Sequence, residues 1–240
     1  MTDAAAPPPV PADLAAVAAA TRRFLDSARE LTDADLAAPS LLPGWTRGHL
    51  LTHLARNADS LVNLLTWART GIETPQYPDP TTRDADIAAG AGRPISEQYP
   101  DNETAAARWA EAAAELPSTA WTTLVRNRQG REFAGAAIGW MRLQEVEIHH
   151  VDLAFGYTPD DWPADFVARL LPEVVATHGM NAGDRLAFEL RTDDTGFGAT
   201  IGAGAPGTLI TGPAHALLAW LLGRGADGLT GDLPELPAWR

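Results

Sequence analysis

Two residues of the kinds that bind metal ions lie on one face of a predicted helix in the chain. Within the stretch 142–152 (RLQEVEIHHVD), Glu145 and His149 are four residues apart, and this spacing puts them on the same helix face. Apolar Ile138 and Met141 continue that face, so we expect it to point into the protein. Because a buried carboxylate is costly unless it is paired or bound to a cation, the pattern indicates a metal site.

An earlier predicted helix, 46–70, offers matching histidines. His49 and His53 are also four residues apart and lie beside its apolar positions. Two imidazoles and one carboxylate are typical of a catalytic zinc site, in which a further position stays open for water or substrate. The spacing does not decide between His49 and His53. On spacing alone, a Glu–His pair on one helix is more often a surface ion pair than a metal site.

Other ionisable residues are weaker candidates. Glu147 and His150 fall off the shared face of their helix, so we expect them to be solvated. His178 and His215 have no companion residues in the sequence, and we expect structural or exposed positions for them.

Two arginines beside flexible sequence could recognise a carboxylate. Arg83 lies in the segment 77–92, which is predicted to be a loop, and Arg224 lies in the sequence LLGRG at a predicted helix end. A guanidinium can bind a carboxylate through two hydrogen bonds, and neighbouring glycine lets the backbone approach closely. The alternative for each arginine is a cation that interacts with a helix dipole.

The composition excludes several classes of chemistry. The chain has 18 basic residues, all of them arginine, against 31 acidic residues, which gives a net charge of −13. This charge argues against nucleic-acid and membrane partners. The chain has no cysteine, so it has no thiol nucleophile of its own, and the absence of lysine excludes Schiff-base chemistry. No signal peptide or membrane span is visible, so we expect a cytoplasmic protein.

Hydrophobic periodicity predicts a helical bundle followed by a small α/β domain. The boundary is expected near residue 158, with a bundle domain over 1–157 and a second domain over 158–240. The predicted bundle helices cover 11–30, 46–70, 102–116 and 134–155, with a long loop over 72–100. The second domain is predicted to contain helices over 165–178 and 213–222 and strands over 186–192, 199–201 and 208–210. No heptad repeat argues for an obligate dimer, so we expect a monomer.

Three segments together resemble the mycothiol-dependent maleylpyruvate isomerase family. They are residues 40–77 (SLLPGWTRGHLLTHLARNADSLVNLLTWARTGIETPQY), 140–153 (WMRLQEVEIHHVDL) and 223–239 (GRGADGLTGDLPELPAW). The resemblance runs in order along nearly the whole chain. It implies a DinB-like metal-binding bundle with a small C-terminal α/β domain.

The resemblance also implies roles for particular residues. The family's zinc ligands fall on His53, Glu145 and His149, and its substrate-binding positions on Arg83 and Arg224. Nitrogen and oxygen ligands also suit other divalent metals. Gln144 departs from the family pattern, because a basic residue is expected there.

The family converts maleylpyruvate to fumarylpyruvate in gentisate catabolism. Isomerising a conjugated alkene requires temporary loss of its double-bond character, and reversible addition of a thiolate achieves this. Because the chain has no cysteine, the resemblance implies that mycothiol supplies the sulfur and that a dicarboxylate is the substrate. Two alternatives stay open: a mycothiol S-transferase of the same fold acting on another electrophile, and a non-catalytic DinB-like metal-binding protein.

Overall fold

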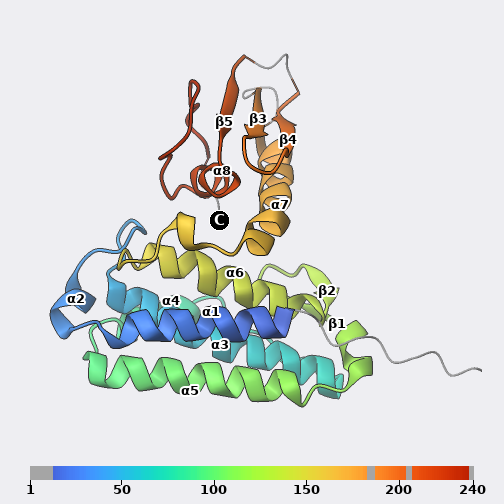
Figure 1. Ribbon diagram of the computed structural model, residues 1–240. Helices are drawn as coiled ribbons and strands as arrows, with labels where there is room; N and C mark the ends of the chain where they lie inside the picture. The colour runs from blue at the N-terminus through green and yellow to red at the C-terminus, as the bar shows by residue number, and fades with distance from the viewer. Residues whose placement is uncertain (1–12, 183–186, 204–206, 238–240) are drawn as a thin grey trace, which may run out of the picture. The chain divides into compact units, whose positions relative to one another are not determined.

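The protein consists of two compact units, residues 1–156 and residues 157–240. The computed structural model describes residues 13–182, 187–203 and 207–237 (Figure 1). The first unit is a bundle of long helices, and the second is a small unit of helices and one sheet. The predicted combination of a helical bundle with a small α/β domain is therefore confirmed. No helix in the described ranges is both long and apolar enough to cross a membrane.

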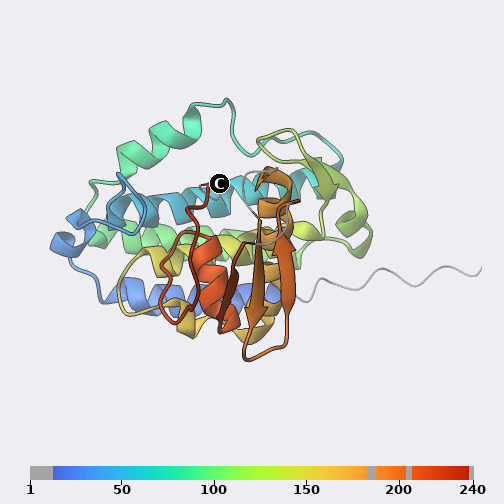
Figure 2. The same ribbon diagram turned by 90° about the horizontal axis from the view of Figure 1, so that it is seen from above.

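The first unit is built around helix α3. Its long helices are α1 (Asp13–Arg29), α3 (Arg47–Thr70), α5 (Ile95–Ala114) and α6 (Ala137–Asp152). Figures 1 and 2 show that these helices run side by side. Helix α3 packs against both α5 and α6, and α1 packs against α6. The leucines of α3 are fully enclosed and form much of the core: Leu50, Leu51, Leu54, Leu61, Leu64 and Leu65.

Local sequence signals fix both ends of α3. Thr46 and His49 form a reciprocal capping box at its N-terminus, and each side chain bonds the backbone of the other residue. At the C-terminus, Gly71 adopts a left-handed conformation with φ of 72°, which only glycine adopts readily. The predicted helix 46–70 is therefore confirmed within one residue.

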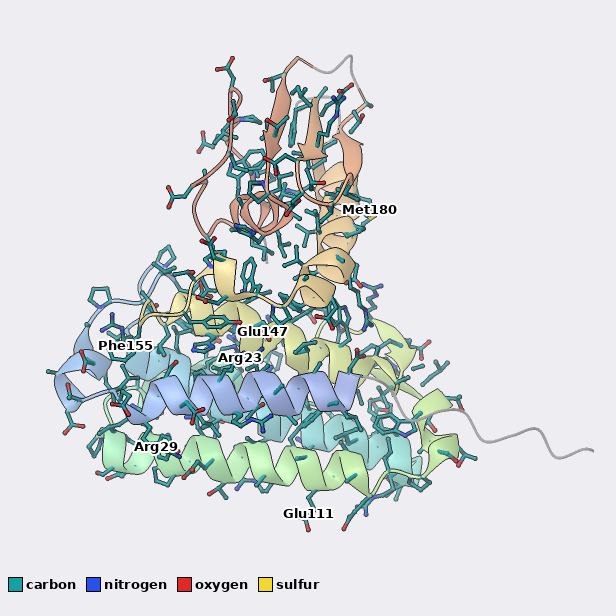
Figure 3. The ribbon with its side chains drawn as sticks, in the orientation of Figure 1. Arg23, Arg29, Glu111, Glu147, Phe155 and Met180 are labelled. Carbon is teal, nitrogen blue, oxygen red and sulfur yellow. The ribbon has the colours of Figure 1, made fainter. Side chains whose placement is uncertain are left out.

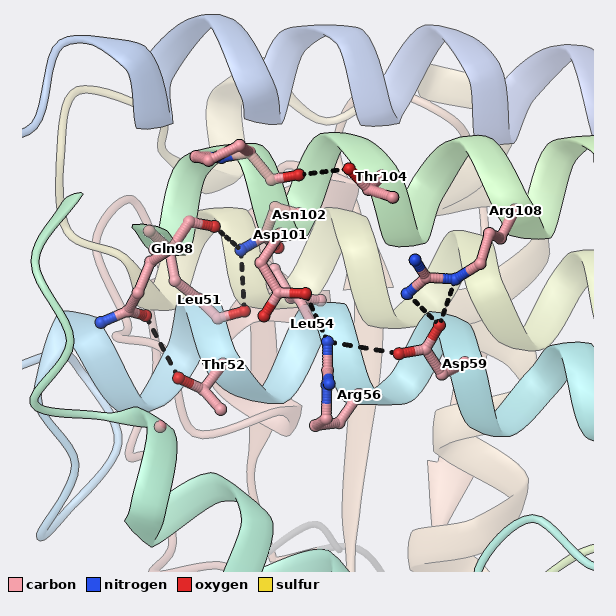
Figure 4. Close-up of polar contacts among 12 residues, drawn as sticks. Leu51, Thr52, Leu54, Arg56, Asp59, Gln98, Asp101, Asn102, Thr104 and Arg108 are labelled. Atoms are coloured by element: carbon pink, nitrogen blue, oxygen red, sulfur yellow. Dashed lines mark hydrogen bonds and ion pairs between the residues drawn. The ribbon is translucent and has the colours of Figure 1, made fainter. Parts of the chain in front are cut away.

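Polar side chains fasten α3 to α5 (Figure 4). Asn102 donates from Nδ2 to the carbonyl oxygen of Leu51 at 3.0 Å, and Thr52 donates to Gln98 Oε1 at 3.1 Å. Farther along the same pair of helices, Arg56 bridges to Asp101. These bonds satisfy polar groups that the close approach of the helices removes from water.

Helix α5 begins earlier than the sequence predicts. We expected a start at residue 102, but the helix begins at Ile95 and contains Pro100, although proline lacks a backbone donor. Contacts outside the helix hold its first turn: the Ile95 amide donates to Asp33 Oδ1, and Gln98 Nε2 donates to the carbonyl oxygens of Ala91 and Arg93. These tertiary contacts outweigh the local preference.

The predicted loop over 72–100 also contains a helix, α4 (Thr82–Gly90). Glycine permits α4 to lie directly on α3. A Cβ atom added at Gly90 would come within 2.5 Å of Thr52, and one added at Gly48 would lie 2.2 Å from the Ala91 carbonyl oxygen. The remaining short elements of this unit are α2 (Asp33–Ala37), the 3₁₀ turn η1 (Ser118–Thr122) and a hairpin of β1 (Leu124–Arg126) and β2 (Glu132–Ala134).

The second unit packs two helices with a three-stranded sheet. Its elements are η2 (Pro159–Asp161), α7 (Ala164–Ala182), β3 (Phe188–Thr192), β4 (Gly198–Ile201), β5 (Leu209–Gly212) and α8 (Ala214–Leu221). The strand order is β4-β3-β5, with β4 antiparallel and β5 parallel to β3. The strands and helices predicted here are confirmed, apart from shifts at their ends. Leu186, the first residue of the first predicted strand, lies outside the described residues.

Candidate metal centre

Three side chains from two helices converge within the bundle. His53 comes from α3, and Glu145 and His149 come from α6; one ligand-type atom of each lies within 4.8 Å of the others. The Nε2 atom of His53 is 2.9 Å from Glu145 Oε2, and the Nε2 atom of His149 is 3.4 Å from the same oxygen. The two imidazole rings meet edge to face with 4.7 Å between their centroids. The arrangement can hold a divalent metal ion, because two imidazoles and a carboxylate are a set that zinc accepts with a position left open.

The cluster of His53, Glu145 and His149 is enclosed on one side and accessible on the other. The side chain of His53 is 3% exposed, whereas those of His149 and Glu145 are 16% and 34% exposed. The helix face that carries Glu145 and His149 therefore meets His53 of α3, as we expected, and also borders an opening.

The opposite ring nitrogens of the two histidines have different surroundings. His149 Nδ1 lies 2.8 Å from Asp152 Oδ2, and Asp152 is completely buried. His53 Nδ1 is buried and has no hydrogen-bond partner among the residues that the structure describes. One imidazole is thus oriented by a carboxylate, and the other is held by the packing around it.

Burial and hydrogen bonding shift the pKa values of the cluster in different directions. Burial lowers the pKa of His53 to about 4 against the opposing hydrogen bond to Glu145. Burial acts to raise the pKa of Glu145, but hydrogen bonds from His149 and His53 outweigh it and hold this pKa well below its usual range. For His149, burial is outweighed by hydrogen bonds to Asp152 and Glu145, and its pKa is raised. An ionised Glu145 and a neutral His53 are the forms that bind a metal ion.

His49, the second histidine left open by spacing, has another role. Its Nδ1 atom lies 3.2 Å from the Thr46 amide nitrogen and 2.8 Å from Thr46 Oγ1 in the capping box of α3. The ring stacks on Trp45, with 6.1 Å between centroids. Trp45 also packs edge-on against His53 at 5.5 Å. His49 therefore stands outside the cluster and helps to position the tryptophan that covers it.

Arg83 lies close to Trp45, the tryptophan that packs against His53. The structure places it in α4 rather than in the predicted loop. Its guanidinium carbon is 5.8 Å from the centre of the Trp45 ring, and Nη1 pairs with Asp84 at 2.7 Å. The charge of Arg83 acts to lower the pKa of His53. The arginine is thus near enough to influence the cluster without bonding to it.

Sequence reasoning missed a buried arginine one helical turn before Glu145. Arg142 is 3% exposed and donates from Nη1 to the Leu54 carbonyl oxygen at 3.0 Å and to Asn57 Oδ1 at 2.8 Å. Within the described part of the chain it forms no ion pair. Burial lowers its pKa to about 10, and the charge of Glu145 opposes this shift. The signal in the sequence was an arginine inside an otherwise apolar stretch, WMRL.

A polar layer connects this arginine to the segment after α3. Ser60 donates to the Asn57 carbonyl oxygen at 2.9 Å and lies 3.4 Å from Gln76 Nε2. The amide nitrogen of Arg128 donates to Gln76 Oε1 at 2.8 Å. Burial raises the pKa of Tyr77, against a hydrogen bond with Ser60, and the charges of Arg83 and Glu145 also act on it.

These segments enclose a cavity of about 330 Å³. Its lining includes Tyr77 and three arginines, Arg83, Arg126 and Arg128, together with the acidic residues Glu73 and Asp79. Arg126 lies over Trp67 and pairs with Glu132 at 3.5 Å. In a chain with a net charge of −13, this gathering of cations suits a small anionic ligand.

Arg224, the second predicted arginine, belongs to the second unit. It follows Gly223, which has a φ of 78°, beyond the end of α8. Its amide donates to the Ala219 carbonyl oxygen, and Nη1 donates to the Leu222 carbonyl oxygen at 2.5 Å. It also lines a cavity of about 240 Å³ with Asp160 and His215. These contacts are those of a cation at a helix end, the alternative that the sequence left open, and they do not test substrate binding.

The expectation that Glu147 and His150 are solvated is wrong. Both are 1% exposed. Glu147 accepts from Arg23 of α1 at 2.5 Å, in a pair labelled in Figure 3, and His150 Nε2 lies 2.8 Å from Ser27 Oγ. The physical reason is that α6 packs against α1 on the side away from the cluster, so a second face of this helix is buried.

His178 is also buried and bonds the Leu221 carbonyl oxygen, whereas His215 is partly exposed beside Asp160.

Comparison with known proteins gives a consistent result. Residues 17–154 match the family described as the mycothiol maleylpyruvate isomerase N-terminal domain. A crystal structure of a mycothiol-dependent maleylpyruvate isomerase matches with 32% sequence identity and a TM-score of 0.89, over 95% of each chain. The structure of a histidine-to-alanine mutant of such an isomerase matches at 31% identity with the same TM-score and coverage. No curated protein matches significantly.

The family match spans more than half of the chain, and the structural match extends through the second unit. The cluster of His53, Glu145 and His149 lies within the matched segment. The chain belongs to the mycothiol maleylpyruvate isomerase family.

Proposed function

We propose that this protein is a mycothiol-dependent maleylpyruvate isomerase that converts maleylpyruvate to fumarylpyruvate. The observation that carries the proposal is the convergence of His53, Glu145 and His149 within 4.8 Å in a chain of this family. The reaction would place the protein in gentisate catabolism, and we propose a cytoplasmic monomer.

His53, Glu145 and His149 would hold a zinc ion or another divalent metal. A bound zinc ion would favour the thiolate form of a neighbouring thiol. The residues themselves contribute the geometry. The exposed side of Glu145 and His149 leaves room for a further ligand, and Trp45 shields the buried side through its contact with His53.

The sulfur must come from outside the chain, because the sequence contains no cysteine. A thiol that adds to the conjugated alkene and leaves again allows rotation about the former double bond. The protein's part is to bring the two reactants together in an orientation that favours this exchange.

Arginines would bind the dicarboxylate substrate. Arg83 lies over Trp45, which packs against the cluster, and it lines the cavity that Arg126 and Arg128 also line. A guanidinium binds a carboxylate through two hydrogen bonds and stabilises negative charge that develops during the reaction. We propose that Arg83 and Arg224 are substrate-binding residues.

The test is an isomerase assay on protein dialysed free of small thiols. We expect negligible fumarylpyruvate formation without thiol and catalytic turnover with mycothiol, with the amount of free thiol unchanged at the end. Stoichiometric consumption of thiol would favour the S-transferase alternative. Metal binding without turnover of any electrophile would favour a non-catalytic protein, and full turnover without thiol would contradict the proposed chemistry.

A further inference from the structure

A buried carboxylate of α6 stands directly behind one of the candidate metal ligands. Asp152 is fully buried, and its Oδ2 atom is 2.8 Å from His149 Nδ1. The other ring nitrogen of His149, Nε2, faces Glu145 at 3.4 Å. We infer that Asp152 is a positioning residue that fixes the orientation and tautomer of His149 for the metal; this inference rests on the metal site proposed above.

The two nitrogens of a neutral imidazole have different roles. One nitrogen carries a proton and donates, and the other offers a lone pair to a metal. Because a carboxylate accepts hydrogen bonds, Asp152 favours the proton on Nδ1 of His149. The lone pair is then on Nε2, the nitrogen that lies in the cluster. A hydrogen bond of this kind also makes the imidazole a stronger ligand.

The backbone around Asp152 is held in place by Leu41, which precedes α3, and by Arg47, the first residue of α3. The carbonyl oxygen of Asp152 accepts from the Leu41 amide at 2.9 Å. Arg47 donates from Nε to the Leu153 carbonyl oxygen at 2.7 Å and from Nη2 to that of Ala154 at 2.8 Å. The end of α6 is therefore fixed, and Asp152 presents its carboxylate to His149 from a constrained position.

Helix α6 contains a second buried carboxylate that can serve as a control for Asp152. Glu147 is also a buried carboxylate, 1% exposed, but it pairs with Arg23 of α1 on the side away from the cluster. If Asp152 only stabilised the fold, replacement of Asp152 and of Glu147 would have similar consequences for metal binding. A positioning role predicts that only Asp152 matters for the metal.

The experiment measures zinc affinity by competition with a chelator in the wild type and in the folded variants Asp152→Ala, Asp152→Asn and Glu147→Gln. Loss of the carboxylate behind a metal-bound histidine weakens affinity by about 10- to 100-fold, and we expect that loss in Asp152→Ala. Asp152→Asn keeps an oxygen that accepts from Nδ1 and should recover part of the affinity. Glu147→Gln should bind zinc as the wild type does. Wild-type affinity in Asp152→Ala would overturn the inference.

A second measurement keeps the inference testable if Asp152→Ala does not fold. In ¹⁵N-labelled, zinc-loaded wild-type protein, long-range ¹H–¹⁵N spectra should show His149 protonated on Nδ1 and metal-bound through Nε2. A metal-bound Nδ1 would overturn the inference. If the wild type binds no zinc at all, the proposed metal site fails, and this outcome is distinct from the failure of Asp152 alone.

Discussion

The two units of the chain bury different kinds of side chain. Among the described residues, those of the bundle that are polar and buried include Thr52, His53, Asn57, Ser60, Gln76, Gln98, Asn102, Arg142, Glu147, His150 and Asp152. In the described part of the second unit, only His178 and Thr192 belong to this class. The sheet and helices there are filled by apolar residues such as Phe188, Ile210 and Leu217.

This difference indicates where the chemistry resides. A buried polar group costs free energy unless it is bonded, and a buried charge costs more. The bundle meets that cost with specific partners, such as Asn57 for Arg142 and Arg23 for Glu147. An apolar interior like that of the second unit is the simpler way to stability. Some of these bonds, such as that of Arg142 one turn before Glu145, lie near the candidate metal cluster, and others fasten neighbouring helices to one another.

The largest expected effect on stability comes from the buried arginine of the bundle. Arg142→Met leaves the Leu54 carbonyl oxygen and Asn57 without their donor. Buried acceptors without donors cost about 1–3 kcal/mol each, so for two acceptors we expect a loss of about 2–6 kcal/mol in the free energy of unfolding, measured with denaturant.

His178→Phe in the second unit provides the comparison. It removes one hydrogen bond to the Leu221 carbonyl oxygen, and we expect a loss of about 1–2 kcal/mol. Equal losses in the two variants, or a gain for Arg142→Met, would break the contrast between the two interiors.

Acid should destabilise the metal-free bundle through His53. Its pKa in the folded protein is about 4, below the ordinary value of 6.5, so the folded state favours the neutral ring. The contribution of His53 to the free energy of unfolding is complete above pH 6.5. It is lost as the pH falls towards 4, by up to about 3 kcal/mol. We expect the unfolding free energy of the metal-free wild type to fall more steeply over this range than that of His53→Gln.

His149 provides a second test, because its pKa is shifted in the opposite direction to that of His53. Its pKa is raised, so its contribution is complete below the unfolded pKa and is lost as the pH rises through the folded pKa. Identical pH profiles for the wild type, His53→Gln and His149→Gln would contradict the assignment of these shifts.

Substitution of one arginine in each unit tests whether both contribute to substrate binding. Loss of a charge-assisted bond to a carboxylate costs about 1.5–3 kcal/mol, or about ten- to a hundredfold. We expect kcat/KM to fall by this factor in Arg83→Met and in Arg224→Met, with zinc content unchanged. Wild-type kinetics in Arg224→Met would mean that this arginine serves only as a cation at the end of α8.

The sequence predicts α1, α3 and α6 and the pairing of Glu145 with His149 well, because these features depend on local spacing. Glu145 and His149 share a face of one helix, and that relation survives folding unchanged. The choice between His49 and His53 depends on which histidine points at α6. Spacing on one helix contains no such information, and only the resemblance indicated His53.

Features that depend on contacts between distant segments could not be predicted. Burial of Glu147 and His150 requires knowing that α1 covers the second face of α6. The start of α5 depends on a hydrogen bond that the Ile95 amide donates to Asp33, which lies far away in sequence. Helix α4 depends on the close fit that Gly48 and Gly90 permit. In each case a tertiary contact outweighs a local preference.

The central claim is that His53, Glu145 and His149 hold the metal, and metal analysis of the full-length protein tests it most directly. We expect about one zinc ion per chain in the wild type and loss of that zinc in His53→Ala. His49→Gln is the matched control, because glutamine suits the capping box while the imidazole is removed. We expect this variant to keep its zinc. Full zinc occupancy in His53→Ala, or loss of zinc in a folded His49→Gln, would contradict the account.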